Sequence, residues 1–338
     1  MRVFAIRQRE DTITAMRDAE LVEIVRSGFR EGVHRGSVAV LGADGTLVYA
    51  LGETGAPLFP RSSNKPLQGL AMLRAGLDLP DDADVALACA SHSGETEHVE
   101  RALAILGKHG LGEDALGCPA ELPSHEASRN ALLAGGGGAR RAAMNCSGKH
   151  AAMLATCVQL RWPTEGYLDP AHPLQVAVRE TVEELTGERV AATAVDGCGA
   201  PLFAFSLAGL AHAFLALVSA EPGTPERRIA DAMRAYPYLV AGAGREDTRL
   251  MSAVSGLLCK AGAEGVHAAA VPGVGAVALK VTDGAARARL PIMVGALRAL
   301  GVPASPELDA LAEDPVLGRG EPVGVVRLLP DVFGRSSG

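Results

Sequence analysis

The chain passes from strand-rich to helical sequence at Pro60-Arg61-Ser62-Ser63-Asn64-Lys65-Pro66. Before this stretch, the β-rich runs 37–41 and 46–51 flank an Asp-Gly turn, which predicts a β-hairpin. After it, leucines at 67, 70, 73 and 77 recur at helical spacing. Serine and asparagine are good N-cap residues and proline is tolerated near a helix start. We therefore expect a helix that begins within a residue or two of Ser62.

The remaining sequence separates into helical and strand-forming parts. Helical patterns fill the middle of the chain, residues 202–219 among them, and a period of two returns near the end. Strands at both ends with helices between them predict an α+β fold. We expect one domain over residues 1–338, with a sheet from about 22–60 and 266–330 and a helical region from about 61–265.

Composition limits the classes of protein to consider. The 338 residues are 48% hydrophobic and 21% charged, which is typical of a globular protein. The formal net charge of -7 argues against nucleic-acid and anionic-membrane partners, because both favour a basic patch. Residues 1–9 contain no apolar stretch as long as that of a signal peptide, so we expect a cytoplasmic protein. In that reducing compartment the six cysteines would be free thiols or metal ligands.

Ser62 and Lys65 lie three residues apart and therefore on one face of a helix. A serine hydroxyl is a poor nucleophile at neutral pH, and a lysine can act as its base when burial or a nearby cation lowers the lysine pKa. N–H groups at the helix end can stabilise an oxyanion. Taken alone, this common pattern favours a capped helix with an exposed lysine. Pro66 also biases Lys65 away from helical geometry.

Other polar residues interrupt apolar segments. Ser91 and Ser93 follow an apolar run at a turn, where a second catalytic hydroxyl and a helix N-cap are equally good interpretations. Lys280 lies in an otherwise apolar strand, which is costly unless the lysine is paired or at an edge, so it is a candidate second base. Lys260 is expected at the surface or paired with Glu264, four residues on.

Two cysteines lie in glycine-containing turns, Cys146 in residues 145–150 and Cys198 in residues 196–201. Two thiolates with a histidine or a carboxylate would satisfy tetrahedral zinc. Neither segment contains a Cys-x-x-Cys pair, however. Spacing alone therefore favours two buried thiols in tight turns over a metal site.

Five segments occur in a fixed order: Arg61-Ser62-x-x-Lys65-Pro66-x-Gln68, Cys89-Ala90-Ser91-His92-x-Gly94-Glu95, Asn145-Cys146-Ser147-Gly148-Lys149-His150, Asp196-Gly197-Cys198-Gly199-Ala200-Pro201 and Lys260-x-Gly262-Ala263-Glu264-Gly265. Together they resemble the rhizobial-type, zinc-binding L-asparaginase family. The resemblance extends from about Val22 to the last expected strand. It implies a serine β-lactamase/penicillin-binding-protein/glutaminase-like fold, with an antiparallel sheet built from both termini, and a homodimer.

The resemblance also implies a reaction, the hydrolysis of L-asparagine to L-aspartate and ammonia. It implies that Ser62 is the nucleophile with Lys65 as its base. Ser91 and Lys280 would form a second Ser–Lys pair.

The family pattern further implies a zinc site and a substrate site. Zinc would be held by Cys146, Lys149, Cys198 and a water, and it would support substrate binding instead of generating the nucleophile. Lysine is an unusual zinc ligand because it must be neutral to donate, and spacing alone favours His150. The residues expected around the substrate are Arg61, His92, Gly94 and Asp196, and further candidates for counter-charges are Arg245 and Asp247.

Two other functions stay open. One is a glutaminase or another Ser–Lys amidase or esterase on the same fold, which would differ from an asparaginase in its activity on glutamine. The other is a non-catalytic zinc-binding or interaction protein, in which Ser62→Ala would remove no activity. The presence of both Ser–Lys pairs argues against the second.

Overall fold

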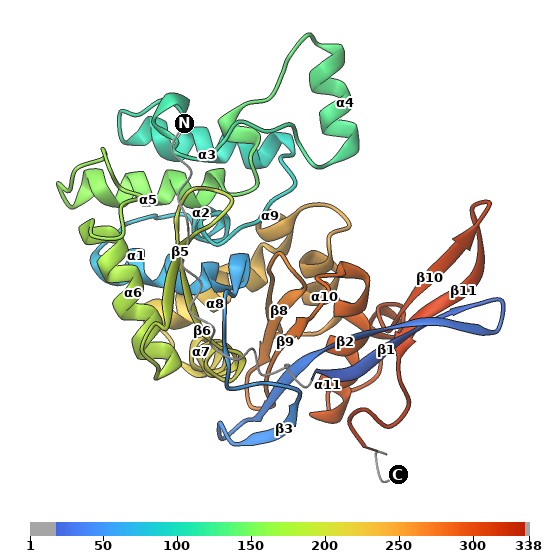
Figure 1. Cartoon of the computed structure of the whole chain (residues 1–338). Coiled ribbons are helices and arrows are strands. Elements are labelled where there is room, and N and C mark those ends of the chain that lie inside the picture. Colours follow the sequence, from blue (N-terminus) through green and yellow to red (C-terminus); the bar gives the residue numbers. More distant parts are fainter. Residues whose placement is uncertain (1–17, 335–338) are drawn as a thin grey trace, which may run out of the picture.

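The computed structural model describes residues 18–334, and a large antiparallel sheet crosses it. The strand order is β10-β11-β1-β2-β9-β8-β7, and β3 pairs with β2 outside this path. Its strands are β1 (Ala19–Arg26), β2 (Phe29–Gly42), β3 (Leu47–Leu51), β7 (Leu258–Ala261), β8 (Val266–Val271), β9 (Gly275–Val281), β10 (Glu313–Gly318) and β11 (Glu321–Leu328). Figure 1 shows the blue strands from the start of the chain beside the red ones from its end. The α+β class and the antiparallel sheet from both chain ends are confirmed; the expectation for residues 1–9 lies outside the described residues.

Most helices lie in sequence between β3 and β7. They are α1 (Lys65–Ala75), α2 (Asp82–Ala88), α3 (Thr96–Lys108), α4 (Glu126–Ala134), α5 (Ser147–Gln159), α6 (Pro173–Thr186), α7 (Leu207–Ser219), α8 (Pro225–Ala235), α9 (Pro237–Ala241) and α10 (Glu246–Ala253). A small sheet of order β4-β6-β5 accompanies them, with β4 (Pro57–Leu58), β5 (Ala192–Val195) and β6 (Pro201–Ser206). Helices α11 (Arg289–Ala299) and α12 (Pro306–Asp309) follow β9.

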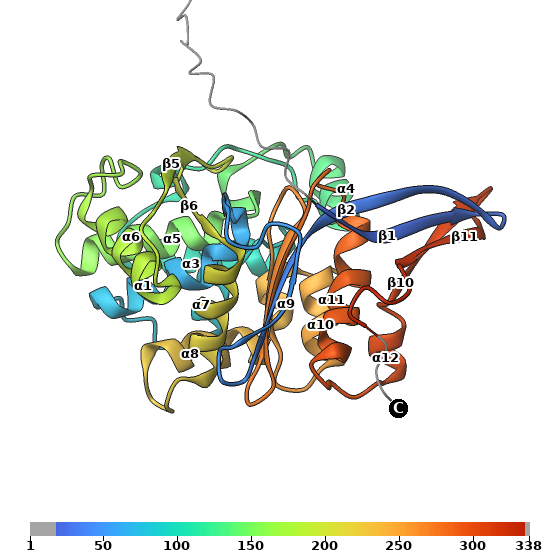
Figure 2. The same ribbon diagram turned by 60° about the horizontal axis from the view of Figure 1, so that its bottom comes forward.

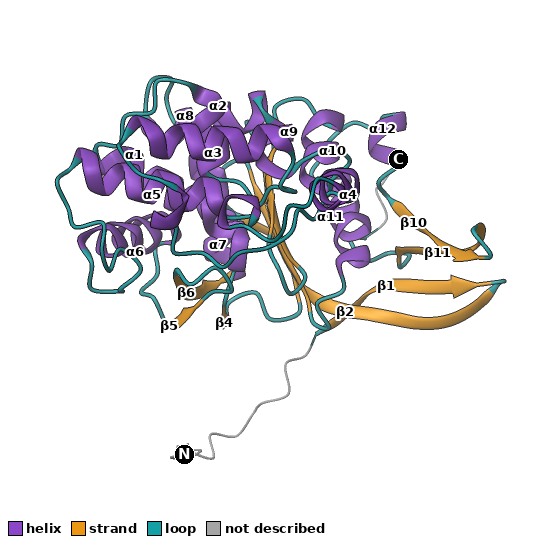
Figure 3. Ribbon diagram, turned by 90° about the horizontal axis from the view of Figure 1, so that it is seen from above, coloured by secondary structure: helices purple, strands orange, loops and turns teal. Residues whose placement is uncertain are grey.

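The large sheet is covered on both faces. Helix α7 packs against β2, β8 and β9, and α11 packs against β1, β8, β9 and β11. Figures 2 and 3 show α1, α6 and α7 on one side of the strands and α11 on the other. The pocket described below opens at the end of β7, the edge strand of this sheet.

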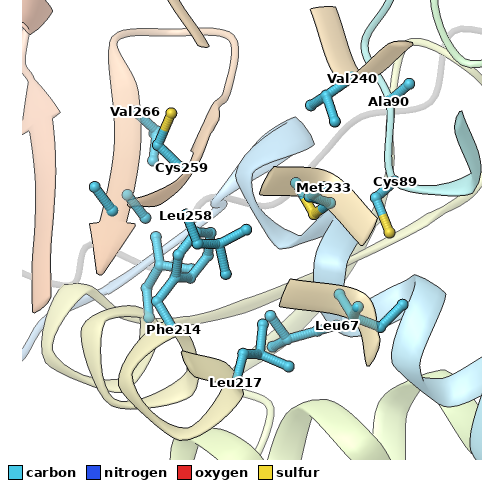
Figure 4. Packing of buried hydrophobic residues seen from close by; sticks show 14 of the residues in the cluster. Leu67, Cys89, Ala90, Phe214, Leu217, Met233, Val240, Leu258, Cys259 and Val266 are labelled. Atoms are coloured by element: carbon cyan, nitrogen blue, oxygen red, sulfur yellow. The ribbon is translucent and has the colours of Figure 1, made fainter. Parts of the chain in front are cut away.

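Helix α7 is apolar around most of its circumference because it lies between the sheet and other helices. Figure 4 shows Phe214 and Leu217 of α7 near Leu67 of α1 and Leu258 of β7. All four side chains are fully buried, and burial of one such side chain stabilises the fold by roughly 1.5–3 kcal/mol. These contacts fix α1, which follows Ser62, relative to β7.

The segment 202–219 corrects an expectation, because its first part is strand β6. Every residue of β6 is buried, and a continuous apolar run of this length is compatible with either structure. Ser206 marks the change, since its hydroxyl accepts a hydrogen bond from the Gly209 N–H at 3.0 Å and caps α7.

Helical structure begins where the sequence predicts. A 3-10 turn, η1 (Arg61–Asn64), precedes α1 directly, and Pro66 is accepted in the first turn of α1. Lys65 is helical, with φ -60° and ψ -33°, so the bias that Pro66 imposes on it is overcome. Among residues 18–334, no helix combines the length and apolarity needed to cross a membrane.

Candidate active site

A pocket of about 540 Å³ opens where η1, the loop after α2, the start of α10 and the end of β7 meet. Its polar and charged lining residues are Ser62, Ser91, His92, Ser124, Asn145, Arg245, Glu246, Asp247, Lys260 and Arg289. Three of the predicted site residues, Ser62, Ser91 and His92, thus line one pocket. Arg245 and Asp247, expected as counter-charges, line it as well. Segments far apart in the sequence supply its three serine hydroxyls and its three cationic side chains.

The end of β7 passes directly against the segment before Ser62. A Cβ atom on Gly262 would lie 2.6 Å from the Pro60 carbonyl oxygen, which no side chain tolerates. Glycine at this position therefore lets Lys260 and Ser62 face the same pocket. Arg61 has a φ of 52°, a left-handed conformation that is costly for a residue with a side chain.

Lys65 lies buried behind the pocket and contacts Ser91. Its Nζ donates to Ser91 Oγ at 2.8 Å, to Cys146 Sγ at 2.9 Å and to the Ala90 carbonyl at 2.5 Å. Burial lowers the pKa of Lys65, and the ammonium groups of Lys149 and Lys260 lower it further against the opposing effect of Cys146. The hydrogen-bond partner of Lys65 is thus the hydroxyl of Ser91; the expected pairing of Lys65 with Ser62 stays a prediction.

Lys260 lines the pocket and is almost completely buried, with 1% of the residue exposed. Its Nζ donates to Asp247 Oδ2 at 3.1 Å and to the Ala261 carbonyl at 2.8 Å. Its expected surface location, or pairing with Glu264, is therefore wrong; Glu264 Oε1 lies 3.6 Å from Arg61 Nη1. The sequence signal for the burial of Lys260 is its position directly after the apolar pair Leu258-Cys259.

Lys280 lies outside this pocket. It stands near the end of the central strand β9, opposite Ser37, and its Nζ donates to the Val281 carbonyl at 2.5 Å. Burial lowers the pKa of Lys280, opposed by the charges of Glu264, Asp18 and Asp283. The expected Ser91–Lys280 pair is corrected, because strand β9 turns this lysine toward backbone carbonyls and acids; Lys260 faces the pocket instead.

His92 and Gly94 shape the loop that carries Ser91. The Gly94 N–H donates to His92 Nδ1 at 3.1 Å, and His92 Nε2 lies 2.9 Å from Ser147 Oγ. Burial holds the pKa of His92 well below its usual value. Gly94 has a φ of 74°, and a Cβ there would lie 2.7 Å from the Ala143 carbonyl oxygen. Both ring nitrogens of His92 are engaged by protein groups, and Gly94 does not line the pocket.

The three predicted zinc ligands lie together behind Lys65. Lys149 Nζ donates to Cys198 Sγ at 3.2 Å, and the Cys146 and Cys198 thiols are hydrogen-bonded neighbours. The hydrogen bond from Cys146 and the Lys149 ammonium hold the pKa of Cys198 below its usual value. The same pairing and burial raise the pKa of Cys146 well above its usual value.

A further nitrogen donor stands beside these thiols. His150 is fully buried, and its Nδ1 lies 2.7 Å from the Tyr167 hydroxyl. Its Nε2 has no hydrogen-bond partner among the described residues, and the ring interacts with Cys198. Zinc binds thiolate sulfur and neutral nitrogen in tetrahedral sites. The cluster therefore has the donor types that zinc prefers. Burial lowers the pKa of Lys149, but the neighbouring thiols outweigh burial and leave this pKa raised, which favours the charged form of the lysine.

Arg61 and Asp196 form an ion pair beside Ser62. The Arg61 Nε donates to Asp196 Oδ1 at 2.8 Å. The other carboxylate oxygen of Asp196 lies 4.0 Å from Cys198 Sγ. The pair therefore connects the segment before the candidate nucleophile to the thiol cluster.

A second buried group could hold a metal ion. Asp247, Cys259 and His267 each offer one ligand atom, and these atoms lie within 4.8 Å of one another. Asp247 already accepts from the Lys260 ammonium, and a cation at that position would face this charge. Spacing gives no hint of this group, because its residues come from α10, β7 and β8.

Comparison with known proteins gives one extensive match. A model of the family described as L-asparaginase II matches residues 22–328. Among solved structures, Mglu in its native form shares 16% identity over 78% of this chain and 63% of that chain, with a TM-score of 0.34. The chain thus spans less than two thirds of Mglu. A Bacillus glutaminase shares 14% identity over 80% of this chain and 85% of that chain, with a TM-score of 0.30. Both TM-scores are too low to indicate a shared function. No curated protein matches the chain.

Proposed function

The chain belongs to the L-asparaginase II family, and we propose that it hydrolyses L-asparagine to L-aspartate and ammonia. The observation that carries the proposal is the arrangement of Ser62, Ser91 and Lys260 around one pocket, with Lys65 buried behind Ser91. A lysine in this setting can accept a proton because burial disfavours its charged form. The pocket thus offers hydroxyl nucleophiles and a base.

In the proposed first step, Ser62 Oγ attacks the side-chain amide carbon of the substrate. Ser91 donates its proton to Lys65 and takes the proton of Ser62. The carbon–nitrogen bond then breaks, and the proton on Lys65 returns through Ser91 to the departing ammonia. Water hydrolyses the resulting aspartyl ester by the same proton route in reverse, which releases aspartate and restores Ser62.

The charged groups around the pocket suit an amino-acid substrate. Lys260, Arg245 and Arg289 line the pocket and supply positive charge for the α-carboxylate. Asp196 is not among the residues that line the pocket, but Arg61 holds it beside Ser62, where its carboxylate would meet the α-ammonium group. Opposite charges at two separated positions would orient asparagine so that its side-chain amide faces the serines.

We propose that zinc is held by Cys146, Lys149 and Cys198, with His150 as a neighbouring nitrogen donor. The bound ion would supply positive charge close to Asp196 and thereby support substrate binding. Lys149 must lose its proton to donate, and the thiolate of Cys198 is already favoured without metal. We also propose a cytoplasmic homodimer, which light scattering after size-exclusion chromatography would test as twice the mass of one 34.7 kDa chain.

The test is ammonia release from L-asparagine and from L-glutamine by the wild type, Ser62→Ala and Ser63→Ala. Ser63 is the matched control because it is buried next to Ser62 and its hydroxyl donates to the Pro60 carbonyl at 2.7 Å. We expect release from asparagine, loss of at least roughly 10³-fold in Ser62→Ala, and retention in Ser63→Ala.

Two other results would redirect the proposal. Faster release from glutamine would make the protein a glutaminase on the same site. Full activity of Ser62→Ala, with trapping of an aspartyl ester on Ser91 by mass spectrometry, would move the nucleophile to the hydroxyl that contacts Lys65.

A further inference from the structure

A buried group of three charged or titratable residues lies behind one wall of the pocket. Asp247 comes from α10, Lys260 from β7 and His267 from β8. Each is at most 3% exposed. The proposed reaction uses Lys260 alone of these three, which leaves the function of the carboxylate open.

The Asp247 carboxylate contacts both the side chain and the backbone at the end of β7. Its Oδ2 accepts from Lys260 Nζ at 3.1 Å, and its two oxygens lie 2.9 and 3.1 Å from the Ala261 backbone nitrogen, which donates to them. His267 Nε2 lies 3.0 Å from Oδ1, at ion-pair distance. Strand β7 is at the edge of the sheet, so Asp247 supplies an acceptor that a neighbouring strand would otherwise provide.

We propose that Asp247 is a positioning residue that holds the Lys260 ammonium group at the pocket wall, where it meets the carboxylate of the substrate. This inference rests on the proposed function. A lysine side chain is flexible and its ammonium group is a point charge. Lys260 lines the pocket with only 1% of the residue exposed, so the direction of its ammonium group is set mainly by its two acceptors, Asp247 and the Ala261 carbonyl.

Asp84 shows what a purely structural buried carboxylate looks like in this protein. It is also 3% exposed, and it accepts from Arg101 Nη1 at 3.1 Å and Lys108 Nζ at 3.2 Å. The side chain of Lys108 is 55% exposed, however, and Asp84 does not line the pocket. Asp84→Asn is therefore a matched control for the loss of a buried, paired carboxylate away from the substrate.

The experiment is a double-mutant cycle on kcat and KM for asparagine, with Asp247→Asn, Lys260→Met and the double variant. Thermal unfolding defines a temperature at which each variant is folded. We expect kcat/KM to fall in Asp247→Asn on the order of 10²-fold, as a misplacement of about 1 Å can cause, largely through KM. The double variant should be no worse than Lys260→Met, because Asp247 acts only through that lysine.

Two further variants keep the test decisive if Asp247→Asn does not fold. Asp247→Glu keeps the charge and displaces the carboxylate by one methylene, so we expect a folded protein with a raised KM. The double variant removes both buried charges together and should be more stable than either single variant. Asp84→Asn should lower the unfolding temperature with kcat/KM within about twofold of wild type.

The inference would be overturned by a folded Asp247→Asn or Asp247→Glu protein with the KM of the wild type. It would also be overturned if the losses of the two single variants multiplied in the double variant. Both outcomes require a wild type that hydrolyses asparagine. Absence of wild-type activity would contradict the proposed function, and the cycle would then be measured as L-aspartate affinity by calorimetry, where the same coupling is expected.

Discussion

The thiol cluster behind Lys65 and the acidic group behind Lys260 differ in how their charges are satisfied. In the first, Cys198 faces the ammonium group of Lys149, and the neighbouring His150 Nε2 has no hydrogen-bond partner among residues 18–334. In the second, the carboxylate of Asp247 already accepts from Lys260 and from a backbone N–H group. Each group holds a lysine ammonium, Lys149 or Lys260, and ring nitrogens without a hydrogen-bond partner in the described part of the chain, of His150 or His267. We expect zinc in the thiol cluster because its donors are sulfur and nitrogen, and the alternative is the group of Asp247, Cys259 and His267.

Cysteine substitutions separate the two groups. Zinc content after dialysis, measured by mass spectrometry, should be lost in Cys198→Ala and retained in Cys259→Ala. Loss of a direct ligand should weaken zinc binding by more than the roughly 10- to 100-fold that loss of an outer partner causes. Cys157, which is buried in α5 away from both groups, supplies a second control. Zinc lost from Cys259→Ala and kept by Cys198→Ala would place the metal beside Asp247.

The residues of the site differ in how far sequence could predict them. Ser62, Ser91 and the two turn cysteines could be predicted because each lies in a short sequence motif. Lys260 was missed because its burial depends on Asp247, which lies 13 residues earlier on another element. Both Lys260 and Lys280 interrupt apolar strands, and only the pairing of β7 with β8 at the sheet edge shows which one faces the pocket.

At the scale of elements, Glu95 joins the two loops that carry pocket residues. Its Oε1 accepts from Ser93 Oγ at 2.6 Å, in the loop of Ser91, and from the Ala243 N–H at 2.9 Å, in the loop of Arg245. Burial raises the pKa of Glu95, but these hydrogen bonds and the nearby His125 outweigh it, so the pKa lies below its usual value.

The lowered pKa of Glu95 predicts a specific dependence of stability on pH. The ionised carboxylate stabilises the folded state fully above the unfolded pKa of about 4.5, and this stabilisation is lost as pH falls through the lower folded pKa. Glu95→Gln should therefore reduce the free energy of unfolding by about 1–2 kcal/mol at neutral pH. The deficit should shrink below pH 4.5 in urea titrations. Glu97→Gln, on the exposed face of α3, should change little at any pH, whereas a pH-independent deficit in Glu95→Gln would show that the carboxylate charge is not involved.

Element boundaries were predictable where caps and breakers mark them. Helix α6 begins at Pro173 and ends before the left-handed Gly187, and a sequence shows both of these residues as start and stop signals. The junction of β6 with α7 has no such break in hydrophobicity. An all-buried strand followed by an all-buried helix gives one continuous apolar run, and only Ser206 marks the change.

For the whole molecule, pairing between the first and last strands joins the two ends of the described chain. Val22 to Arg26 of β1 pair with Leu328 to Gly324 of β11. The sequence predicts sheet over about 22–60 and 266–330, whereas the pairing of these two strands depends on contacts across some three hundred residues. The helical middle packs on this sheet through α7, so the sheet and the helices should unfold together.

A change in the last strand should therefore be sensed in the helical region. Val326 is 1% exposed and pairs with Ile24, and Val326→Ala should lower the free energy of unfolding by roughly 0.5–3 kcal/mol. Trp162, the single tryptophan, lies between α5 and α6 and reports on the helices. Its fluorescence and the far-UV circular dichroism should shift to the same lower denaturant midpoint. Leu317→Ala, at a 53% exposed position of the neighbouring strand β10, should leave both midpoints nearly unchanged. If Val326→Ala shifted the dichroism midpoint and left the Trp162 midpoint in place, the sheet and the helical region would be separate folding units, and the expectation of one domain would be wrong.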